Sequence, residues 1–264
     1  MTTTGNPLPS ETFPEGLIRR LYVLDYGLFQ VHENGRIIGI AGYLIQTQDG
    51  RNILVDTGFP AWYVEDPAAA SLEDDLGSFG SVLRLDSDNL PASQLAIVGL
   101  KTSDIHLLVI THGDVDHVGG LVEFQANFGQ ATIVVGRAER ALDRPRYFGD
   151  RRPIAWPAGA NYQLVDGDEE LCPGVALLST PGHSPGHLSL LLRLPQTGVV
   201  LLTADAIARP AEFEEGFGGA WDEGQARASA ERLMAIADRE QAMIIYGHDP
   251  EQWKTLPKAP EYFP

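Results

Sequence analysis

Four residues that can bind a metal ion lie within six positions of one another near the middle of the chain. They are His112, Asp114, Asp116 and His117, and they follow the apolar run 107–110. Imidazole and carboxylate groups suit zinc, iron and manganese. A loop that follows a buried strand holds such groups at the rigid edge of a sheet, where sites are usually built. A plain solvated loop explains so many ligating side chains poorly, so the segment predicts a metal site.

Three later segments also end an apolar run with a side chain that can bind a metal. Those side chains are His183, Asp205 and His248. Each alone is a weak signal, because a single histidine or aspartate after a strand is common. Together with the first four they make seven candidate ligands, which suffice for two metal ions that each keep an open position for water.

The elements that must position these residues alternate between strands and helices. Apolar runs predict strands at 17–25, 37–47, 52–56, 104–110, 131–135, 162–165, 175–179, 188–194, 199–203 and 242–246. Helices are expected at 91–98, 137–143 and 222–240, and Asp222 can cap the last of them. The pattern predicts a mixed α/β protein built as a two-sheet sandwich covered by helices.

The 264 residues contain no long linker, so a single domain over residues 1–264 is expected. Residues 1–16, rich in Thr, Pro and Gly, predict an irregular arm. Residues 59–90 lack clear periodicity and predict a loop insertion, which could act as a lid or as a homodimer contact. Aromatic residues of this loop and of the loop 144–160 either anchor the loops or line an apolar pocket: Trp62, Tyr63, Tyr147, Phe148 and Trp156.

Charge and cysteine content narrow the function classes. The 19 basic and 36 acidic residues give a net charge of −17, which disfavours binding to nucleic acid or to an anionic membrane surface. No apolar run approaches the roughly 18 residues that span a bilayer. Cys172 is the only cysteine, so no intrachain disulfide can form. The amino terminus lacks the basic and apolar regions of a signal peptide, and a cytoplasmic location is expected.

The order of the candidate ligands resembles the signature of the metallo-β-lactamase-fold hydrolase superfamily. That signature is His-x-His-x-Asp-His, followed by a distant His, Asp and His, and the spacing is kept from residue 112 onward. The strand and turn 54–58, Leu-Val-Asp-Thr-Gly, matches as well. The resemblance covers about residues 17–254. It implies an αββα four-layer sandwich of two mixed β-sheets with helices on the outer faces.

Within that superfamily the chain is similar to the N-acyl homoserine lactonases. The likeness is carried by residues 20–27, 180–189 and 246–252. It implies a dinuclear metal-dependent hydrolase that opens a lactone, or cleaves another ester, by means of a hydroxide that bridges the two metals. It further implies a small-molecule substrate, with an N-acyl homoserine lactone favoured, and two divalent metal ions, with zinc favoured.

The resemblance also suggests a role for each candidate ligand. We hypothesise that one ion is held by His112, Asp114 and His183 and the other by Asp116, His117 and His248, with Asp205 bridging them. Asp116 would lie beside the attacking water and could pass a proton to the leaving oxygen, which makes it the candidate catalytic residue. Asp56 is expected to orient the ligands through hydrogen bonds. His187 either does the same or serves a turn or packing role.

Two positions depart from the pattern of the lactonases. Asp114 stands where the signature has its second histidine. An added carboxylate makes the site less positive and opens the preference to iron or manganese. Ala208 stands three positions after Asp205, where the lactonases carry a tyrosine that stabilises a substrate oxygen. This second departure concerns the choice of substrate and leaves hydrolysis intact.

Three other functions fit parts of the sequence. A phosphotriester or phosphoester hydrolase could use the same two-metal chemistry on the same fold. A di-iron redox protein of the superfamily would also carry a carboxylate at the second signature position, but those proteins have glutamate there and need a flavin domain. A scaffold without catalysis is disfavoured, because six of the seven ligands match and the seventh is replaced by another ligand.

Overall fold

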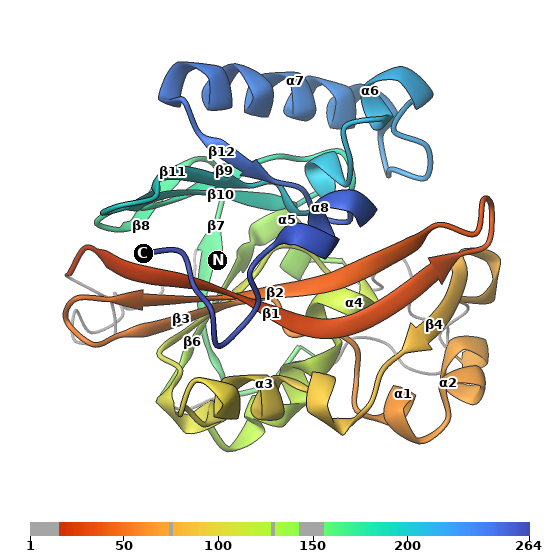
Figure 1. The fold of residues 1–264 in the computed structure, drawn as a ribbon, viewed down its shortest axis with the longest axis horizontal. Helices are drawn as coiled ribbons and strands as arrows, with labels where there is room; N and C mark the ends of the chain where they lie inside the picture. The colour runs from red at the N-terminus through yellow and green to blue at the C-terminus, as the bar shows by residue number, and fades with distance from the viewer. Residues whose placement is uncertain (1–15, 74–75, 128–129, 143–155) are drawn as a thin grey trace, which may run out of the picture.

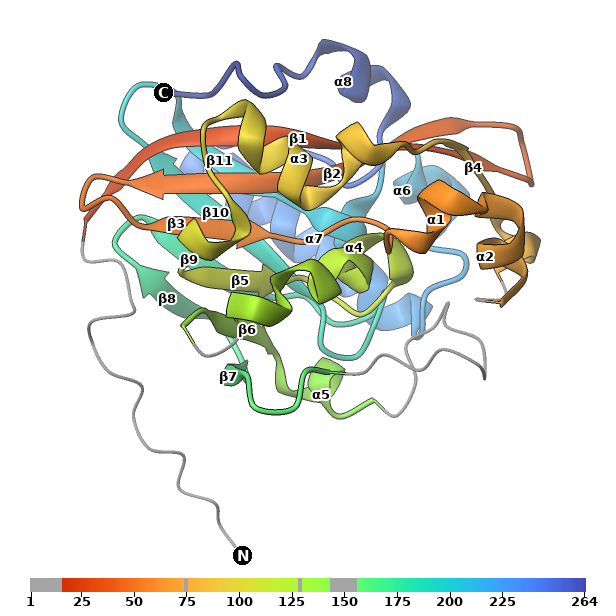
Figure 2. The same cartoon turned by 90° about the horizontal axis from the view of Figure 1, so that it is seen from below.

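The computed structural model describes residues 16–73, 76–127, 130–142 and 156–264. Two β-sheets are stacked face to face (Figure 1). Helix α7 (Glu223–Glu240) covers the outer face of one sheet, and α3 (Pro91–Ile97) lies over β1 (Ile18–Val31) on the outer face of the other (Figure 2). This arrangement confirms the predicted four-layer sandwich.

The larger sheet has seven strands in the order β4-β1-β2-β3-β5-β6-β7. Beside β1 its strands are β2 (Ile37–Thr47), β3 (Asn52–Val55), β4 (Gly80–Arg84), β5 (Leu107–Ile110), β6 (Thr132–Gly136) and β7 (Asn161–Val165). The pairs from β4 to β3 are antiparallel, whereas β3, β5, β6 and β7 are parallel neighbours. Parallel strands end at the same edge of a sheet, so the loops that follow β3 and β5 lie side by side.

The smaller sheet has five strands in the order β12-β11-β10-β9-β8. They are β8 (Glu169–Cys172), β9 (Val175–Ser179), β10 (Leu188–Leu194), β11 (Gly198–Leu202) and β12 (Met243–Ile245). Only β11 and β12 are parallel, and the other neighbours are antiparallel. The loops after β11 and β12 therefore leave the sheet at one edge.

Apolar side chains fill three layers of the molecule. Neighbouring residues of a strand point to opposite faces of its sheet. Val23 of β1 thus packs in the layer between the sheets, with Leu190 of β10, whereas Leu24 packs on the outer side, with Leu95 of α3. The third layer joins the small sheet to α7. The middle layer holds the two sheets together, and the site described below lies at one end of these sheets.

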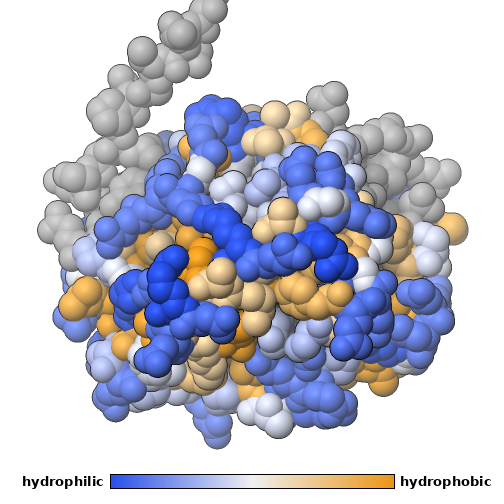
Figure 3. All heavy atoms as spheres, turned by 90° about the horizontal axis from the view of Figure 1, so that it is seen from above, coloured by the Kyte–Doolittle hydropathy of each residue, from blue (hydrophilic) through white to orange (hydrophobic). Residues whose placement is uncertain are grey.

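Helix α7 follows the sequence prediction closely. The side chain of Asp222 caps the helix by accepting a hydrogen bond from the backbone N–H of Gln225. The predicted apolar face, Ala226, Ala230, Leu233 and Ala237, is buried in the layer against the small sheet. The face of the molecule that carries α7 shows hydrophilic side chains with apolar patches between them (Figure 3). The helix shields the small sheet from solvent.

Residues 59–90 are the largest departure from the sequence prediction. The expected loop insertion instead contains α1 (Trp62–Glu65), α2 (Pro67–Glu73) and strand β4, with residues 74–75 outside the described part. Strand β4 extends the large sheet by pairing with β1. A strand of five residues is too short to show a periodic pattern in the sequence. Its structure depends on the pairing with β1, which lies about 50 positions away.

The remaining helices are short: α4 (Val115–Val118), α5 (Arg137–Arg140), α6 (Glu212–Glu215) and α8 (Pro250–Thr255). Helix α5 ends earlier than the predicted 137–143, and α4, α6, α8 and β8 were not predicted. The expected arm 1–16 lies outside the described residues except for Gly16, and so does most of the loop 144–160. Among the described helices, none is both long and apolar enough to cross a membrane.

Candidate metal centre

The seven predicted ligands meet where loops from the two sheets come together. His112 and Asp114 follow β5, Asp116 and His117 belong to α4, His183 follows β9, Asp205 follows β11, and His248 follows β12. The large sheet therefore supplies the residues of the 112–117 motif, and the small sheet supplies the three distant ones. The side chains fall into two groups, each compact enough to surround one ion.

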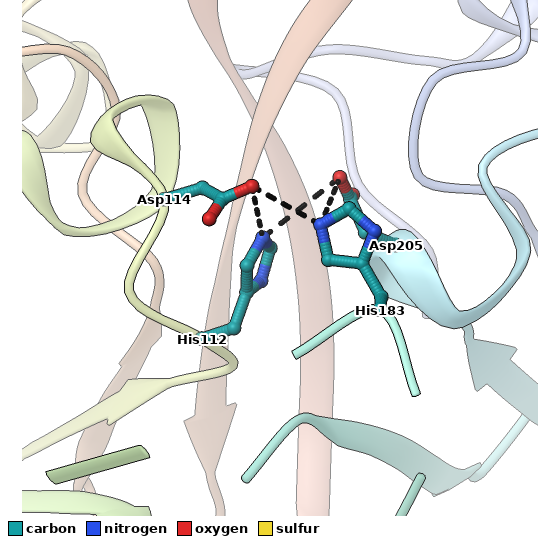
Figure 4. Close-up of side chains that lie close together, drawn as sticks. All are labelled: His112, Asp114, His183 and Asp205. Atoms are coloured by element: carbon teal, nitrogen blue, oxygen red, sulfur yellow. Dashed lines mark hydrogen bonds and ion pairs between the residues drawn. The ribbon is translucent and has the colours of Figure 1, made fainter. Parts of the chain in front are cut away.

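The first group contains His112, Asp114, His183 and Asp205, whose side chains point toward one another (Figure 4). Oδ2 of Asp114 lies 3.6 Å from Nε2 of His112 and 3.1 Å from Nε2 of His183. Oδ2 of Asp205 lies 3.8 Å and 3.4 Å from the same two nitrogens. Two imidazoles and two carboxylates thus face a common centre.

The second group contains Asp116, His117 and His248, and the other oxygen of Asp205 joins it. Oδ2 of Asp116 lies 3.6 Å from Nε2 of His117 and 3.6 Å from Nε2 of His248. Oδ1 of Asp205 lies 3.5 Å and 3.1 Å from these nitrogens. Asp205 therefore stands between the two groups with one oxygen toward each, as a bridging ligand would.

The donor atoms fit two metal ions. Donors about 2.1 Å from a shared ion at tetrahedral angles are about 3.4 Å apart, which is close to the separations measured in both groups. Nε2 of His112, Nε2 of His117 and Oδ1 of Asp205 are buried and have no hydrogen-bond partner among the described residues. Burying a polar atom without a partner is costly. A cation at each centre would satisfy these three atoms.

The hydrogen bonds behind three histidines leave Nε2 free to bind an ion. Nδ1 of His248 donates to the backbone carbonyl of Gly39 at 3.0 Å, and Nδ1 of His117 donates to the Asp56 carboxylate at 2.8 Å. Oγ1 of Thr111 gives its proton to Asp56, so it accepts from Nδ1 of His112 at 3.0 Å. With the proton held on Nδ1, a neutral imidazole presents the Nε2 lone pair to the centre.

The electrostatics of the centre also call for cations. Burial disfavours a charged imidazole, yet the carboxylates of Asp205 and Asp116 outweigh it and raise the pKa of His248 to about 9. Burial opposes the charge on His117 too, but Asp116, Asp205 and Asp56 raise its pKa well above the usual value. Without an ion, protons on these histidines would offset the carboxylates. Metal ions would take over this role and displace the protons.

Asp56 lies where the sequence analysis placed it, behind the ligands. Its Oδ1 accepts a hydrogen bond from the backbone N–H of Thr111 at 2.8 Å, and its Oδ2 accepts from Thr111 Oγ1 at 2.7 Å and from His117. The residue directly follows β3 and has a positive φ of 59°, which few non-glycine residues adopt. One buried carboxylate thus orients His117 directly and His112 through Thr111.

His187 holds the candidate ligand Asp205 in place through a hydrogen bond. Its Nε2 accepts a hydrogen bond from the backbone N–H of Asp205 at 3.1 Å, and its Nδ1 donates to Oγ1 of Thr180 at 2.8 Å. Because Nε2 is occupied by this bond, the imidazole has no lone pair to offer a metal. The sequence left this role open, since it depends on a contact across 18 positions.

Glu139 is a site residue that the sequence analysis missed. It is 2% exposed and accepts three hydrogen bonds: from the backbone N–H of Gly113 at 2.8 Å, from Oγ of Ser184 at 2.7 Å and from the backbone N–H of Gly186 at 3.1 Å. Gly113 lies between two ligands of the large sheet, and Ser184 follows His183. The carboxylate therefore joins the two loops that form the first group. A glutamate at the start of a short helix gave no signal of this.

A cavity of about 170 Å³ opens onto the centre. Its apolar wall consists of Phe29, Val31, Ile38, Phe59, Leu76 and Phe79, and its polar end consists of Asp114, Asp116, Asp205 and His248. Of the two roles that the sequence left open for Trp62, Tyr63 and Trp156, anchoring fits, because none of the three lines this cavity and all three pack with the apolar layer under the large sheet. Tyr147 and Phe148 lie outside the described residues.

Ala208 is fixed by its backbone. Its carbonyl accepts a hydrogen bond from the N–H of His248 at 2.8 Å, and its N–H donates to the carboxylate of Glu212 at 2.8 Å. The segment after Asp205 is thus tied to the last ligand. The methyl side chain brings no polar group to the centre, as the sequence implied.

Fold and site together are those of a dinuclear metallo-hydrolase, and the comparison with known families agrees. The family described as "Metallo-beta-lactamase superfamily" matches residues 39–248. The chain belongs to the metallo-β-lactamase superfamily.

Relatives within the superfamily narrow this further. The chain is 35% identical over 223 residues to an N-acyl homoserine lactonase of Bacillus cereus, covering 83% of this chain and 85% of the relative. It is 37% identical over 227 residues to the N-acyl homoserine lactonase AiiA of Bacillus thuringiensis subsp. kurstaki, with the same coverage. Both relatives place the chain in the family of the N-acyl homoserine lactonases.

Solved structures give the same result. A structure of N-acyl homoserine lactone hydrolase, with the product N-hexanoyl-L-homoserine bound at its catalytic metal centre, superposes with a TM-score of 0.80. It is 31% identical, and the match covers 94% of this chain and all of that one. The family and fold expected from the sequence are thereby confirmed.

Proposed function

We propose that this protein is a dinuclear metal-dependent lactonase that hydrolyses the ring ester of N-acyl homoserine lactones. The observation that carries the proposal is the position of the two histidine and aspartate groups, which share Asp205 at the polar end of an apolar cavity. Relatives named for this activity support the choice of substrate.

The ligand set proposed here assigns His112, Asp114 and His183 to one ion and Asp116, His117 and His248 to the other, with Asp205 between them. Two such ions would polarise the lactone carbonyl and acidify a water molecule. The chain's own contribution is to hold the donors in place through Asp56, His187 and Glu139. The resemblance favours zinc, and the identity of the bound metal stays a prediction.

Asp116 is the proposed catalytic residue. Its side chain is 15% exposed and lines the polar end of the cavity, so one carboxylate oxygen can face the substrate. As water adds to the carbonyl carbon, the ring C–O bond breaks and the leaving alkoxide needs a proton. Asp116 can take the proton from the water and deliver it to that oxygen. The products are then one hydroxyl and one carboxylic acid, and the acid releases the second proton of the water to solvent and becomes a carboxylate.

The apolar wall of the cavity is the proposed site of the acyl chain. Phe29 and Ile38 come from paired positions of β1 and β2, and Phe79 precedes β4. The cavity joins this wall directly to the carboxylates of the centre. A substrate with a polar ring and an apolar tail matches that division, whereas a small polar ester would leave the apolar wall unused.

The proposal is tested by proton release when N-hexanoyl homoserine lactone is added to protein loaded with two metal ions. We expect rapid release, because hydrolysis converts a neutral ester into a carboxylic acid. Asp116→Asn should lower turnover by about 10²–10⁴-fold, and its metal content must be measured to show that both ions remain.

A protein that carries two ions but releases no proton would contradict the lactonase proposal. Phosphotriesters would then be the next substrates to assay, since the same ion pair can serve them. Unchanged turnover in a metal-loaded Asp116→Asn variant would contradict the role of Asp116 alone. The cytoplasmic location and the homodimer contact expected from the sequence stay predictions.

A further inference from the structure

The two groups around Asp205 offer the same kinds of donor atom at similar separations. Each has two histidine Nε2 atoms, one aspartate Oδ2 and one oxygen of Asp205. In the first group, Oδ2 of Asp114 lies 3.1 Å and 3.6 Å from the two histidine nitrogens. In the second group, Oδ2 of Asp116 lies 3.6 Å from both histidine nitrogens. Oδ2 of Asp205 lies 3.4 Å and 3.8 Å from the histidine nitrogens of the first group. Oδ1 of Asp205 lies 3.1 Å and 3.5 Å from those of the second group.

Asp114 is the residue that creates this equivalence. In the signature that the chain resembles, a histidine at this position would give the first group three imidazoles, whereas the second group would keep two. With Asp114 the first group exchanges a neutral nitrogen donor for a charged oxygen. The side chain of Asp114 is 2% exposed, so solvent screens this charge little.

The orientation of Asp114 supports a role toward an ion. The residue occupies the position that precedes α4, where an aspartate side chain commonly accepts a hydrogen bond from the first turn. Asp114 makes no such bond to α4. Its carboxylate instead turns toward His112 and His183 (Figure 4). The chain forgoes a helix cap and directs the oxygen at the centre of the first group.

We propose that Asp114 makes the two half-sites alike, so that the protein takes up two ions of the same kind and accepts Mn²⁺ or Fe²⁺ in both. Two histidines with one carboxylate are a donor set typical of non-haem Fe²⁺, and added carboxylate oxygen favours Mn²⁺ relative to zinc. This inference rests on the dinuclear site of the proposed function and adds the class of metal to it.

Co²⁺ titration tests the equivalence, because the visible spectrum of Co²⁺ reports its ligands. We expect the absorption band of the wild-type protein to keep one shape from the first to the second equivalent of Co²⁺. In Asp114→His the two half-sites differ, so the band should change shape between the two equivalents. A spectrum that changes shape in the wild-type protein would overturn the equivalence.

Competition between Zn²⁺ and Mn²⁺ tests the metal preference. Protein stripped of metal is incubated with both ions in equal amounts, freed of excess and analysed for metal content. Asp114→His should raise the ratio of bound zinc to manganese on the order of tenfold, at an unchanged total of two ions. Asp238→His, on the exposed face of α7, controls for zinc bound by an added histidine elsewhere.

An isosteric variant covers the case in which Asp114→His does not fold. Asp114→Asn keeps an oxygen donor but removes the charge, so it should weaken binding of both metals without raising the zinc-to-manganese ratio. An equal ratio in the wild-type and Asp114→His proteins would overturn the metal preference. Lactone hydrolysis is measured separately, so two matched ions without turnover would contradict the proposed function and leave this inference standing.

Discussion

The carboxylate of Glu139 lies 2.7 Å from the hydroxyl of Ser184, and both side chains are buried. Ser184 belongs to the loop after β9 of the small sheet. Glu139 also accepts a hydrogen bond from the N–H of Gly113, in the loop after β5 of the large sheet. One side chain therefore connects the two sheets at the point where His112 and His183 would face the same ion in the proposed ligand set.

Replacing Glu139 should loosen the first ligand group. Glu139→Gln keeps the size of the side chain but leaves one acceptor oxygen where the carboxylate offers two. At least one buried donor therefore loses its partner, at a cost of about 1–3 kcal/mol in the free energy of unfolding. We expect a lower melting temperature and earlier loss of one of the two ions on dialysis against a chelator. Glu231→Gln, exposed on α7, is the matched control. Retention of both ions and full stability would show that Glu139 is dispensable.

Replacing Asp56 should weaken the second ligand group. In Asp56→Asn one carboxylate oxygen becomes an NH₂ group, which cannot accept the proton on Nδ1 of His117 or that of Thr111 Oγ1. Partners that orient metal-binding histidines are typically worth about 10–100-fold in metal affinity, and a loss of that size is expected here. Isothermal titration calorimetry with the metal ion measures this affinity. Wild-type affinity in the variant would mean that His117 is held by packing alone.

The cavity predicts a dependence on acyl length. Phe79 is 39% exposed and lines the cavity, so Phe79→Ala removes apolar contact without a large loss of stability. Because burying one CH₂ is worth about 0.8 kcal/mol, KM should rise roughly tenfold for a decanoyl substrate and little for a butanoyl one. Leu72→Ala is the control, since Leu72 is 82% exposed and does not line the cavity. Equal changes for both substrates would place the acyl chain elsewhere.

Glu212 predicts a pH dependence of stability. Burial raises its pKa to about 7, so its proton is bound more tightly in the folded than in the unfolded chain. The stability it contributes is therefore present below its ordinary pKa of 4.5 and lost as the pH rises through 7. Relative to Glu212→Gln, the wild-type protein should lose about 1–3 kcal/mol between pH 5 and pH 8. Urea unfolding at a series of pH values measures this, and parallel profiles of the two proteins would contradict it.

Local chemistry made the candidate ligands readable from the sequence. The motif 112–117 concentrates metal-binding side chains, and His183, Asp205 and His248 each follow an apolar run that forms a strand. The two-sheet sandwich, the helix capped by Asp222 and the seven candidate ligands were predictable for the same reason, whereas the αββα order of the layers was implied by the family resemblance. Their signals lie in residue type, in order and in the periodicity of neighbouring residues.

Contacts between distant residues were decided only by the tertiary structure. Glu139 reaches Gly113 and Ser184 across 26 and 45 positions, and His248 reaches Gly39 across 209. The apolar wall of the cavity depends on the pairing of β4 with β1, which no local pattern revealed. The sequence determined which side chains could bind the metals, whereas the stacking of the two sheets decided which groups orient them and which apolar residues face them.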